Sequence, residues 1–324
     1  MRDAYFGQQG RGGGEDGGEK SPTNPGHDSW YAGTPAGGTR WFRLHRMETG
    51  RPSKTALGVA IRRAAHQLME NPPVLVDPIA LPLVGRGHPR LMERAMHPVG
   101  RDFRAFMAVR SRYTEDQLAV AVAQGVTQYV VLGAGLDTFA YRNPFPALRV
   151  FEVDFPATQE WKREQLQAAG IAIPASLAFV PVNFERQSLA TELEARGLRR
   201  DKSAFFSWLG VTPYLTHQAC MATLSFIAGM PAGSGVVFDF AVDKSLLNIG
   251  QRMALAALSR RVAAAGEPFQ LFFHPATLQE ELKGLGFHRT EFLQGKEINA
   301  RYFKDRQDGL QVRGGLGHLM GAWV

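Results

Sequence analysis

The sequence predicts an α/β fold built on a doubly wound, mainly parallel, seven-stranded sheet that is preceded by a helical cap. Short apolar runs that resemble buried strands alternate with helical patterns, as is typical of a parallel sheet with helices on both faces. The run Val130–Leu132 opens directly into Gly133-Ala134-Gly135, which indicates a tight turn after a strand and a helix beginning at its far side. A second run, Leu148–Val153, ends in Asp154, 21 positions after Gly133.

The first 46 residues differ from the rest of the chain in composition. They are rich in glycine, as in Gly10-Arg11-Gly12-Gly13-Gly14, and they show no apolar periodicity. A polar segment of this kind cannot bury enough apolar surface to order its backbone, so we predict a disordered tail at 1–46. A regulatory or partner-binding tail and a natural start at Met47 are alternatives that the sequence leaves open.

The remaining chain, 47–324, is expected to form a single domain with a helical cap at 47–124 and a Rossmann-like core at 125–324. Apolar residues at helical spacing predict two helical segments in the cap: Thr55–Met69, and 89–123 with an interruption near His97-Pro98. Within the second segment, 110–123 has the strongest helical pattern. Pro72-Pro73 ends the first helix, because proline lacks the amide proton that a continuing helix needs.

Strands and helices are expected to alternate through the core. The expected strands are 129–132, 150–153, 178–182, 205–209, 235–242, 287–293 and 316–324. The expected helices are 155–168, 189–196, 217–230, 246–265 and 275–285. Gly197 and Gly286 follow two of these helices, in the position where glycine caps a carboxyl terminus. With right-handed crossovers, this order leaves few possible topologies.

Ligands of doubly wound sheets bind beyond the carboxyl ends of the strands. The turn 133–137, Asp154, Asn183 and the segment after Leu209 all follow predicted strands, so they are expected along that one edge. Glycines in the turn would let the backbone approach a bound ligand closely. An acid at the spacing of Asp154 is where such sheets place the acceptor for ribose hydroxyls. The sequence therefore predicts an adenosine-containing cofactor.

Composition narrows the class of protein. The net charge of +7 comes from dispersed arginines without aromatic interleaving, so a solvated surface is favoured over nucleic-acid binding. The sequence contains neither an 18-residue apolar run nor a secretory signal pattern, so we expect no membrane partner. The single cysteine, Cys220, excludes an internal disulfide and a thiolate metal cluster, is expected to be a core residue, and fits a cytoplasmic location.

Five sequence blocks carry a resemblance to a known family. They are Thr55-Ala56-Leu57-Gly58, Arg110-Ser111-Arg112-Tyr113, Leu132-Gly133-Ala134-Gly135-Leu136-Asp137-Thr138, Phe151-Glu152-Val153-Asp154-Phe155-Pro156 and Gly210-Val211-Thr212-Pro213-Tyr214-Leu215. Because these five blocks occur in this order, the chain resembles the class I S-adenosylmethionine-dependent methyltransferases over 53–324. Within that class it is similar to the leucine carboxyl methyltransferases and their bacterial relatives, the polyketide-type O-methyltransferases. The resemblance implies S-adenosylmethionine as cofactor and a small molecule as methyl acceptor.

The resemblance also implies a set of cofactor-binding residues: Arg110, Gly133, Ala134, Gly135, Asp154, Asn183 and Phe184. The glycine turn would line the methionine part, and Asp154 would accept hydrogen bonds from the ribose hydroxyls. Arg110 would bind the cofactor's carboxylate bidentately, for which a planar guanidinium is suited. Asn183 and Phe184 would meet the adenine.

Two positions depart from the family pattern. Asn183 stands where the family usually has aspartate, so a bond to the adenine amino group could survive without the charge. Leu209 stands where the family often has an acid near the cofactor's amino end. Loss of that acid would weaken cofactor binding by about 1–3 kcal/mol if the ammonium charge is left unpaired. A non-catalytic S-adenosylmethionine-binding protein of the same fold is therefore an alternative.

Several assignments have rivals. Asp154 could instead cap the following helix, with Glu152 on the same strand face as the diol ligand. Arg112 could exchange roles with Arg110, and Asp137 or Tyr214 could be structural only. An oxidoreductase using NAD(P) is less favoured, because the sequence lacks the third glycine of the dinucleotide motif.

The predicted reaction is methyl transfer from S-adenosylmethionine to a carboxylate or hydroxyl of a small molecule. A hydroxyl acceptor needs a base whereas a carboxylate does not, and neither His217 nor His274 stands out as one, so we assign no catalytic residue. No metal site is expected, since the His, Asp and Glu residues lack ligand spacing. The substrate pocket is expected from 53–112 and 246–275, where the apolar strip 269–273 is either a lid or a core segment.

Overall fold

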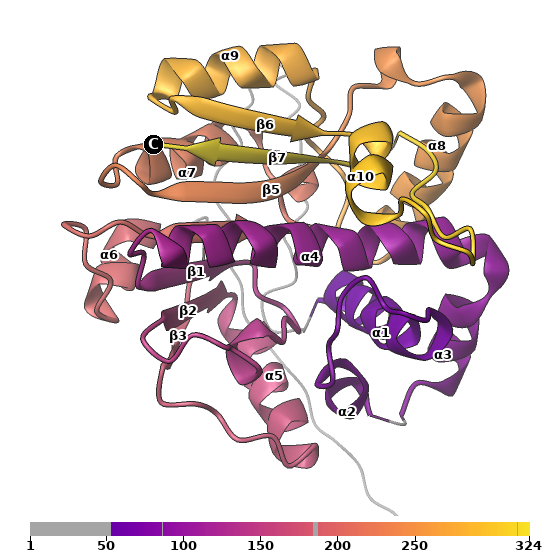
Figure 1. Ribbon diagram of the computed structural model, residues 1–324, viewed down its shortest axis with the longest axis horizontal. Coiled ribbons are helices and arrows are strands. Elements are labelled where there is room, and N and C mark those ends of the chain that lie inside the picture. The colour runs from indigo at the N-terminus through magenta and orange to yellow at the C-terminus, as the bar shows by residue number, and fades with distance from the viewer. Residues whose placement is uncertain (1–52, 86, 184–186, 316) are drawn as a thin grey trace, which may run out of the picture. The chain divides into compact units, whose positions relative to one another are not determined.

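The computed structural model describes residues 53–85, 87–183, 187–315 and 317–324 (Figure 1). The predicted tail at 1–46 and the predicted adenine-binding residue Phe184 lie outside the described residues. The division of 47–324 into one domain with a cap and a core stays a prediction.

A seven-stranded sheet with the order β3-β2-β1-β4-β5-β7-β6 forms the centre of the fold. Its strands are β1 (Gln128–Leu132), β2 (Arg149–Asp154), β3 (Leu177–Pro181), β4 (Phe205–Trp208), β5 (Gly235–Ala241), β6 (Arg289–Leu293) and β7 (Gly317–Trp323). The first five strands are parallel, and β7 runs antiparallel between β5 and β6. The order reverses between β1 and β4, so the ligand-binding edge predicted for such sheets lies at their carboxyl ends.

Ten α-helices surround the sheet in the described part of the chain. They are α1 (Lys54–Met69), α2 (Ala80–Val84), α3 (Pro89–Met96), α4 (Arg101–Ala123), α5 (Pro156–Ala168), α6 (Leu189–Ala195), α7 (His217–Ala228), α8 (Ile249–Ala264), α9 (Pro275–Leu285) and α10 (Gly295–Tyr302). Single 3-10 turns are η1 (Pro98–Gly100), η2 (Phe139–Tyr141), η3 (Thr212–Tyr214) and η4 (Lys244–Leu246).

Alternate residues of the strands enter different cores, as the two-residue period of a strand requires. In β1, Val130 and Leu132 pack in a cluster with α7 and α9, which contains the buried Cys220. Tyr129 and Val131 pack in a second cluster with α4 on the opposite face. Both faces of the sheet are therefore covered by helices, as the alternating sequence pattern predicts, and the seven expected strands are confirmed.

The two short helices α2 and α3, which precede α4, pack against α1. Buried alanines and Ile61 of α1 contact α2 and α3 in a third cluster, which also contains Leu166 of α5. Figure 1 shows α1, α2 and α3 gathered beside one half of the long helix α4. The amino terminus of α1 is capped by Ser53, whose hydroxyl accepts a hydrogen bond from the N–H of Ala56.

The helical segment expected at 89–123 is confirmed: α3, η1 and α4 follow one another, with the interruption at His97-Pro98. The structure differs from the sequence prediction at two places. The helix expected at the far side of the glycine turn does not form, and the described chain between β1 and β2 contains only the 3-10 turn η2. The short helices α2 and α10 were not expected.

Candidate active site

The turn after β1 requires glycine at two positions. Gly133 and Gly135 have φ angles of 64° and 47°, a region that residues with a Cβ rarely adopt. A Cβ on Gly133 would lie 2.3 Å from Cγ2 of Val211, and one on Gly135 would lie 3.0 Å from Cβ of Ala56. The glycines therefore allow the turn to pack against the loop after β4 and the first turn of α1.

Asp154 at the end of β2 holds this turn in place. Its Oδ2 accepts a hydrogen bond from the N–H of Gly135 at 2.6 Å, and its Oδ1 accepts one from the N–H of Phe155 at 2.7 Å. Burial raises the pKa of Asp154, while these backbone donors favour its charged form. Asp154 thus sits at the predicted edge of the sheet, where it also ties together the ends of β1 and β2.

Glu152, the alternative ribose ligand, has a different partner. Its Oε2 accepts a hydrogen bond from Nζ of Lys162 on α5 at 2.6 Å, and both side chains are fully buried. Burial raises the pKa of Glu152 to about 7 despite this pairing. The carboxylate of Glu152 is therefore engaged between β2 and α5, whereas Asp154 reaches the glycine turn.

The two candidate arginines of α4 have different surroundings. Arg110 is buried, and its Nη1 donates to Oδ2 of Asp239 on β5 at 2.6 Å. The Nε of Arg110 is buried without a hydrogen-bond partner. Arg112 is exposed and pairs with Asp116 one turn further along α4. The geometry therefore places Arg110, and not Arg112, against the sheet.

Asp239 was missed by the sequence analysis. Its Oδ1 accepts a hydrogen bond from the N–H of Gly210 at 2.5 Å, and its backbone carbonyl accepts one from Thr212 at 2.6 Å. Asp239 therefore joins Arg110 to the loop after β4. An acid inside the apolar run of β5 is the signal that could have identified it, since a buried carboxylate needs a partner.

The glycine turn is also fixed from the side of α1. Arg63 donates to Oδ2 of Asp77 at 2.7 Å, and the same oxygen accepts a hydrogen bond from Thr138 at 2.6 Å. Oδ1 of Asp137 accepts a hydrogen bond from the N–H of Phe139, the first residue of η2, at 2.8 Å. Sequence reasoning missed the Arg63–Asp77 pair, whose members come from two segments of the cap.

Three polar or aromatic side chains lie together beside this edge. Thr55 at the start of α1 donates a hydrogen bond to Glu267, and Tyr214 lies close enough to both groups for them to affect its pKa. The ring of Tyr214 lies 5.2 Å from that of Phe269, centre to centre. Burial raises the pKa of Tyr214 to about 12, so its hydroxyl stays protonated at neutral pH.

The apolar strip at 269–273 is divided between two environments. Leu271 and Phe273 are buried in the core beside α7 and α9, whereas Phe269 and Phe272 pack against a small cluster around Leu247. The strip is therefore shared between the core and the cluster around Leu247, and its Phe269 also lies beside Tyr214.

The remaining predicted residues are placed as follows. Asn183 follows β3, and its N–H donates to Oε1 of Gln187 at 2.8 Å. His217 begins α7, where it is exposed and pairs with Glu281 at 2.9 Å. His274 precedes α9 and is also exposed. Neither histidine contacts the cluster of Arg110 and Asp239 in the described hydrogen bonds.

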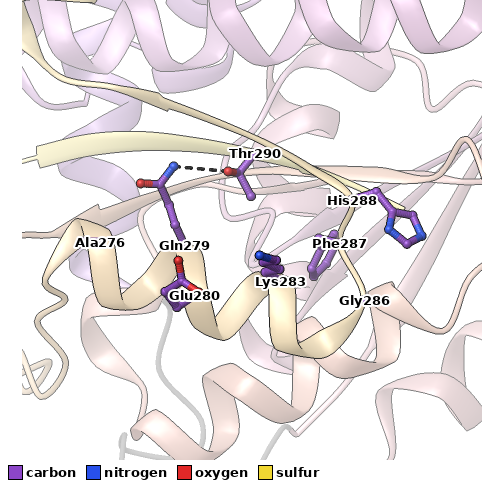
Figure 2. A pocket seen from close by; sticks show the side chains of 8 residues that line it. All are labelled: Ala276, Gln279, Glu280, Lys283, Gly286, Phe287, His288 and Thr290. Atoms are coloured by element: carbon purple, nitrogen blue, oxygen red, sulfur yellow. Dashed lines mark hydrogen bonds between the residues drawn. The ribbon is translucent and has the colours of Figure 1, made fainter.

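A separate hollow of about 570 Å³ lies between α9 and β6 (Figure 2). Its lining includes the exposed Glu280, Lys283 and His288, and Gln279 donates to Thr290 across it at 3.2 Å. It contains none of the residues predicted to bind cofactor.

Among the residues that the structure describes, no three or more His, Cys, Asp or Glu side chains are grouped so that they could hold a metal ion. None of the described helices combines the length and the apolar character needed to cross a membrane.

Known proteins share both the sequence pattern and the fold. The family model described as leucine carboxyl methyltransferase matches residues 56–228. The Bacillus subtilis protein named "Putative S-adenosyl-L-methionine-dependent methyltransferase YktD" is 36% identical over 206 residues, which cover 63% of this chain and 67% of that protein. A similarly named Mycobacterium avium protein is 32% identical over 231 residues, which cover 68% of this chain and 71% of its own.

Two crystal structures show the same fold at low sequence identity. A DUF574 family protein from Streptomyces avermitilis has a TM-score of 0.53 at 15% identity, covering 86% of this chain and 99% of its own. A "putative methyltransferase" from Thermobifida fusca has a TM-score of 0.51 at 16% identity, covering 88% and 99%. The family match over more than half of the chain is the decisive finding. The chain belongs to the leucine carboxyl methyltransferase family, and it is an S-adenosylmethionine-dependent methyltransferase.

Proposed function

We propose that this methyltransferase transfers the methyl group to an oxygen, a carboxylate or a hydroxyl, of a small molecule. The observation that carries the proposal is the grouping of Arg110, Asp239 and the glycine turn at the carboxyl edge of the sheet, with Tyr214 and Glu267 beside it. Arg110 and Asp239 have the charges to hold the amino acid part of the cofactor, and Tyr214 and Glu267 offer an aromatic ring and a carboxylate to the methyl acceptor.

The residues present fit S-adenosylmethionine. The unpartnered Nε of Arg110 is a buried donor that the cofactor's carboxylate would satisfy. We propose that the turn Gly133–Gly135 lines the methionine part and that Asp154 receives the ribose hydroxyls with its remaining lone pairs. Asn183 and Phe184 are proposed for the adenine, as the family resemblance implies.

When bound, S-adenosylmethionine supplies a methyl group on a sulfonium, which an oxygen nucleophile displaces in line. The chain's own task is therefore to align the acceptor and exclude water, and positioning of this kind can supply about 7–11 kcal/mol. Arg110 would hold the carboxylate of the cofactor and Asp154 its ribose, and the rings of Tyr214 and Phe269 would cover the acceptor side.

Glu267 lies on the proposed acceptor side, at hydrogen-bond distance from Thr55. For a hydroxyl acceptor, this carboxylate is placed to take the proton that leaves as the new carbon–oxygen bond forms. A carboxylate acceptor is already a nucleophile and needs no base. Substitution of Glu267 by glutamine therefore separates the two acceptor classes, because only methylation of hydroxyls should slow.

Cofactor binding is tested with a matched pair of arginine variants. Calorimetric titration of S-adenosylmethionine compares the wild type with Arg110→Lys and with the control Arg112→Lys. Arg110→Lys keeps the charge that faces Asp239 but removes the planar fork, so we expect at least tenfold weaker binding. Arg112→Lys should bind like the wild type. A wild type that binds no S-adenosylmethionine, or two equally affected variants, would refute the proposed site.

The acceptor is tested by mass spectrometry with S-adenosylmethionine and a mixture of small phenols, alcohols and carboxylic acids. A gain of one methyl group that survives mild alkali identifies an ether, whereas one that is lost identifies an ester. Methylation only of nitrogen or sulfur compounds in a parallel mixture would contradict oxygen as the acceptor atom.

A further inference from the structure

We propose that Asp239 is the anionic partner of the cofactor's α-ammonium group, in place of the acid that the chain lacks at Leu209. The inference rests on the proposed cofactor site and adds to it a residue that recognises the amino end of the ligand. Asp239 lies on β5, outside the segment 56–228 that matches the family model.

The strand register places Asp239 next to the position of the missing acid. β4 and β5 are parallel neighbours, and Trp208 is aligned with Phe238. The next residue along each strand is Leu209 on one and Asp239 on the other. A carboxylate on β5 therefore reaches the edge of the sheet one strand away from where the family often has its acid.

The side chain of Asp239 contacts the loop that follows Leu209. Its Oδ1 accepts the N–H of Gly210 at 2.5 Å. Gly210 has a φ of 74°, and a Cβ there would lie 3.1 Å from Nη1 of Arg110, so the backbone of this loop approaches the guanidinium closely. Asp239, Gly210 and Arg110 thus form one contiguous surface.

The charges on this surface complement a free amino acid. An α-amino acid carries an ammonium and a carboxylate on adjacent atoms, and Arg110 and Asp239 present the opposite charges 2.6 Å apart. Each carboxylate oxygen of Asp239 accepts one hydrogen bond from the protein, and such an oxygen has two lone pairs. The unpartnered Nε of Arg110 provides the matching donor for the ligand's carboxylate.

A different role would be purely structural: Asp239 could act only by orienting Arg110 and the loop at Gly210. The two roles predict different ligand selectivity. An acid that binds the ammonium affects only ligands that have one, whereas a positioning residue affects every ligand that uses Arg110.

The experiment compares two ligands in two proteins. Calorimetry measures the affinity of the wild type and of Asp239→Asn for S-adenosylhomocysteine and for its deamino derivative, in which hydrogen replaces the amine. We expect the wild type to prefer the amine-bearing ligand by at least tenfold. In Asp239→Asn, this preference should fall to less than threefold, while affinity for the deamino ligand changes little.

Equal weakening of both ligands in Asp239→Asn would overturn the inference, because Asp239 would then act through Arg110 alone. A wild type that binds both ligands equally would overturn it as well, and would leave the cofactor site standing. A wild type that binds neither ligand would overturn the cofactor site itself.

A second variant tests the exchange between neighbouring strands. Leu209→Glu combined with Asp239→Asn restores a carboxylate at the position where the family often has one. We expect this double variant to regain the preference for the amine-bearing ligand, and it also serves if Asp239→Asn alone does not fold. A folded double variant without that preference would contradict the inference.

Discussion

Oδ2 of Asp154 accepts a hydrogen bond from the N–H of Gly135 at 2.6 Å, across the 19 residues that separate the glycine turn from the end of β2. The residue proposed to bind the ribose is therefore also a support of the turn proposed to bind the methionine part. Substitutions at Asp154 should affect both the stability of the protein and its affinity for the cofactor.

Two variants of Asp154 separate these contributions. Asp154→Ala removes both acceptors, so we expect a loss of about 1–3 kcal/mol in the free energy of unfolding and no measurable S-adenosylmethionine binding. Asp154→Asn keeps one carbonyl oxygen for the N–H of Gly135, so more of the stability should remain while cofactor binding is still weakened. Urea unfolding and calorimetry measure the two effects. Wild-type affinity in Asp154→Ala would contradict the ribose assignment.

Gly133→Ala tests the close contact between the glycine turn and the loop after β4. Both Gly133 and Gly125 have a positive φ, but a Cβ on Gly125 meets nothing within 4 Å, whereas one on Gly133 would lie 2.3 Å from Val211. Gly125→Ala is therefore the control for backbone strain alone, about 1–3 kcal/mol. We expect Gly133→Ala to lose at least about 1 kcal/mol more, as is usual for overpacking. Equal losses in urea unfolding would show that the turn can move away from Val211.

The buried carboxyl group of Glu152 predicts a pH dependence of stability. Burial raises its pKa from 4.5 to about 7 in the folded protein, so between these values the native state binds more protons than the unfolded state. The contribution of Glu152 is therefore fully present below about pH 4.5 and is lost as the pH rises towards 7. Urea unfolding from pH 4.5 to 7.5 should show this decline in the wild type.

Glu152→Gln should remove that component of the decline, whereas Glu160→Gln on the exposed face of α5 should leave it unchanged. An unaltered slope in Glu152→Gln would mean that Lys162 keeps Glu152 ionised throughout this pH range.

The buried ion pair of Arg63 and Asp77 predicts that the single substitution Asp77→Asn strongly lowers the free energy of unfolding. Burial by itself would raise the pKa of Asp77, but Arg63 and Arg142 hold it below its ordinary value of 3.8. Asp77→Asn leaves the buried Arg63 without its main counter-ion, which should cost about 3–5 kcal/mol in unfolding free energy at pH 7. The loss should shrink as the pH falls below about 4, where the wild-type carboxylate also becomes protonated.

Asp201→Asn is the control for the Asp77 variant, since Asp201 forms an ion pair with Arg199 in which both side chains are exposed. Its unfolding midpoint should equal that of the wild type. Two variants with the same midpoint would show that the pair beneath the glycine turn contributes no more than a surface pair.

Local sequence patterns were sufficient to predict the strands and the turn of this fold. Strands such as β1, β4 and β5 are largely apolar, buried runs bounded by turn residues, so their positions can be predicted from the neighbouring residues alone. The prediction of a helix after Gly135 was wrong, because contacts with a distant segment hold this part of the chain. Arg63 of α1 donates hydrogen bonds to Asp137 and Thr138, and only the 3-10 turn η2 forms there.

The supporting charges of the site could not be predicted in this way. Arg110 and Asp239 are 129 residues apart, and no local period links a position on α4 to one on β5. The same holds for Tyr113 and Glu291, which hydrogen-bond at 2.8 Å over 178 residues. Such pairs form because the complete fold brings distant helices and strands side by side, and a local sequence pattern does not show which elements become neighbours.

The pairing of Arg110 with Asp239 on β5 also bears on how short a fragment of this chain can be and still be active. The segment that matches the family model ends at residue 228, seven positions before β5 begins at Gly235. A protein cut to the matched segment would contain Arg110 and the glycine turn, yet it would leave the guanidinium facing a missing strand. We therefore expect a protein cut to residues 56–228 to be inactive, because it lacks the partner of Arg110.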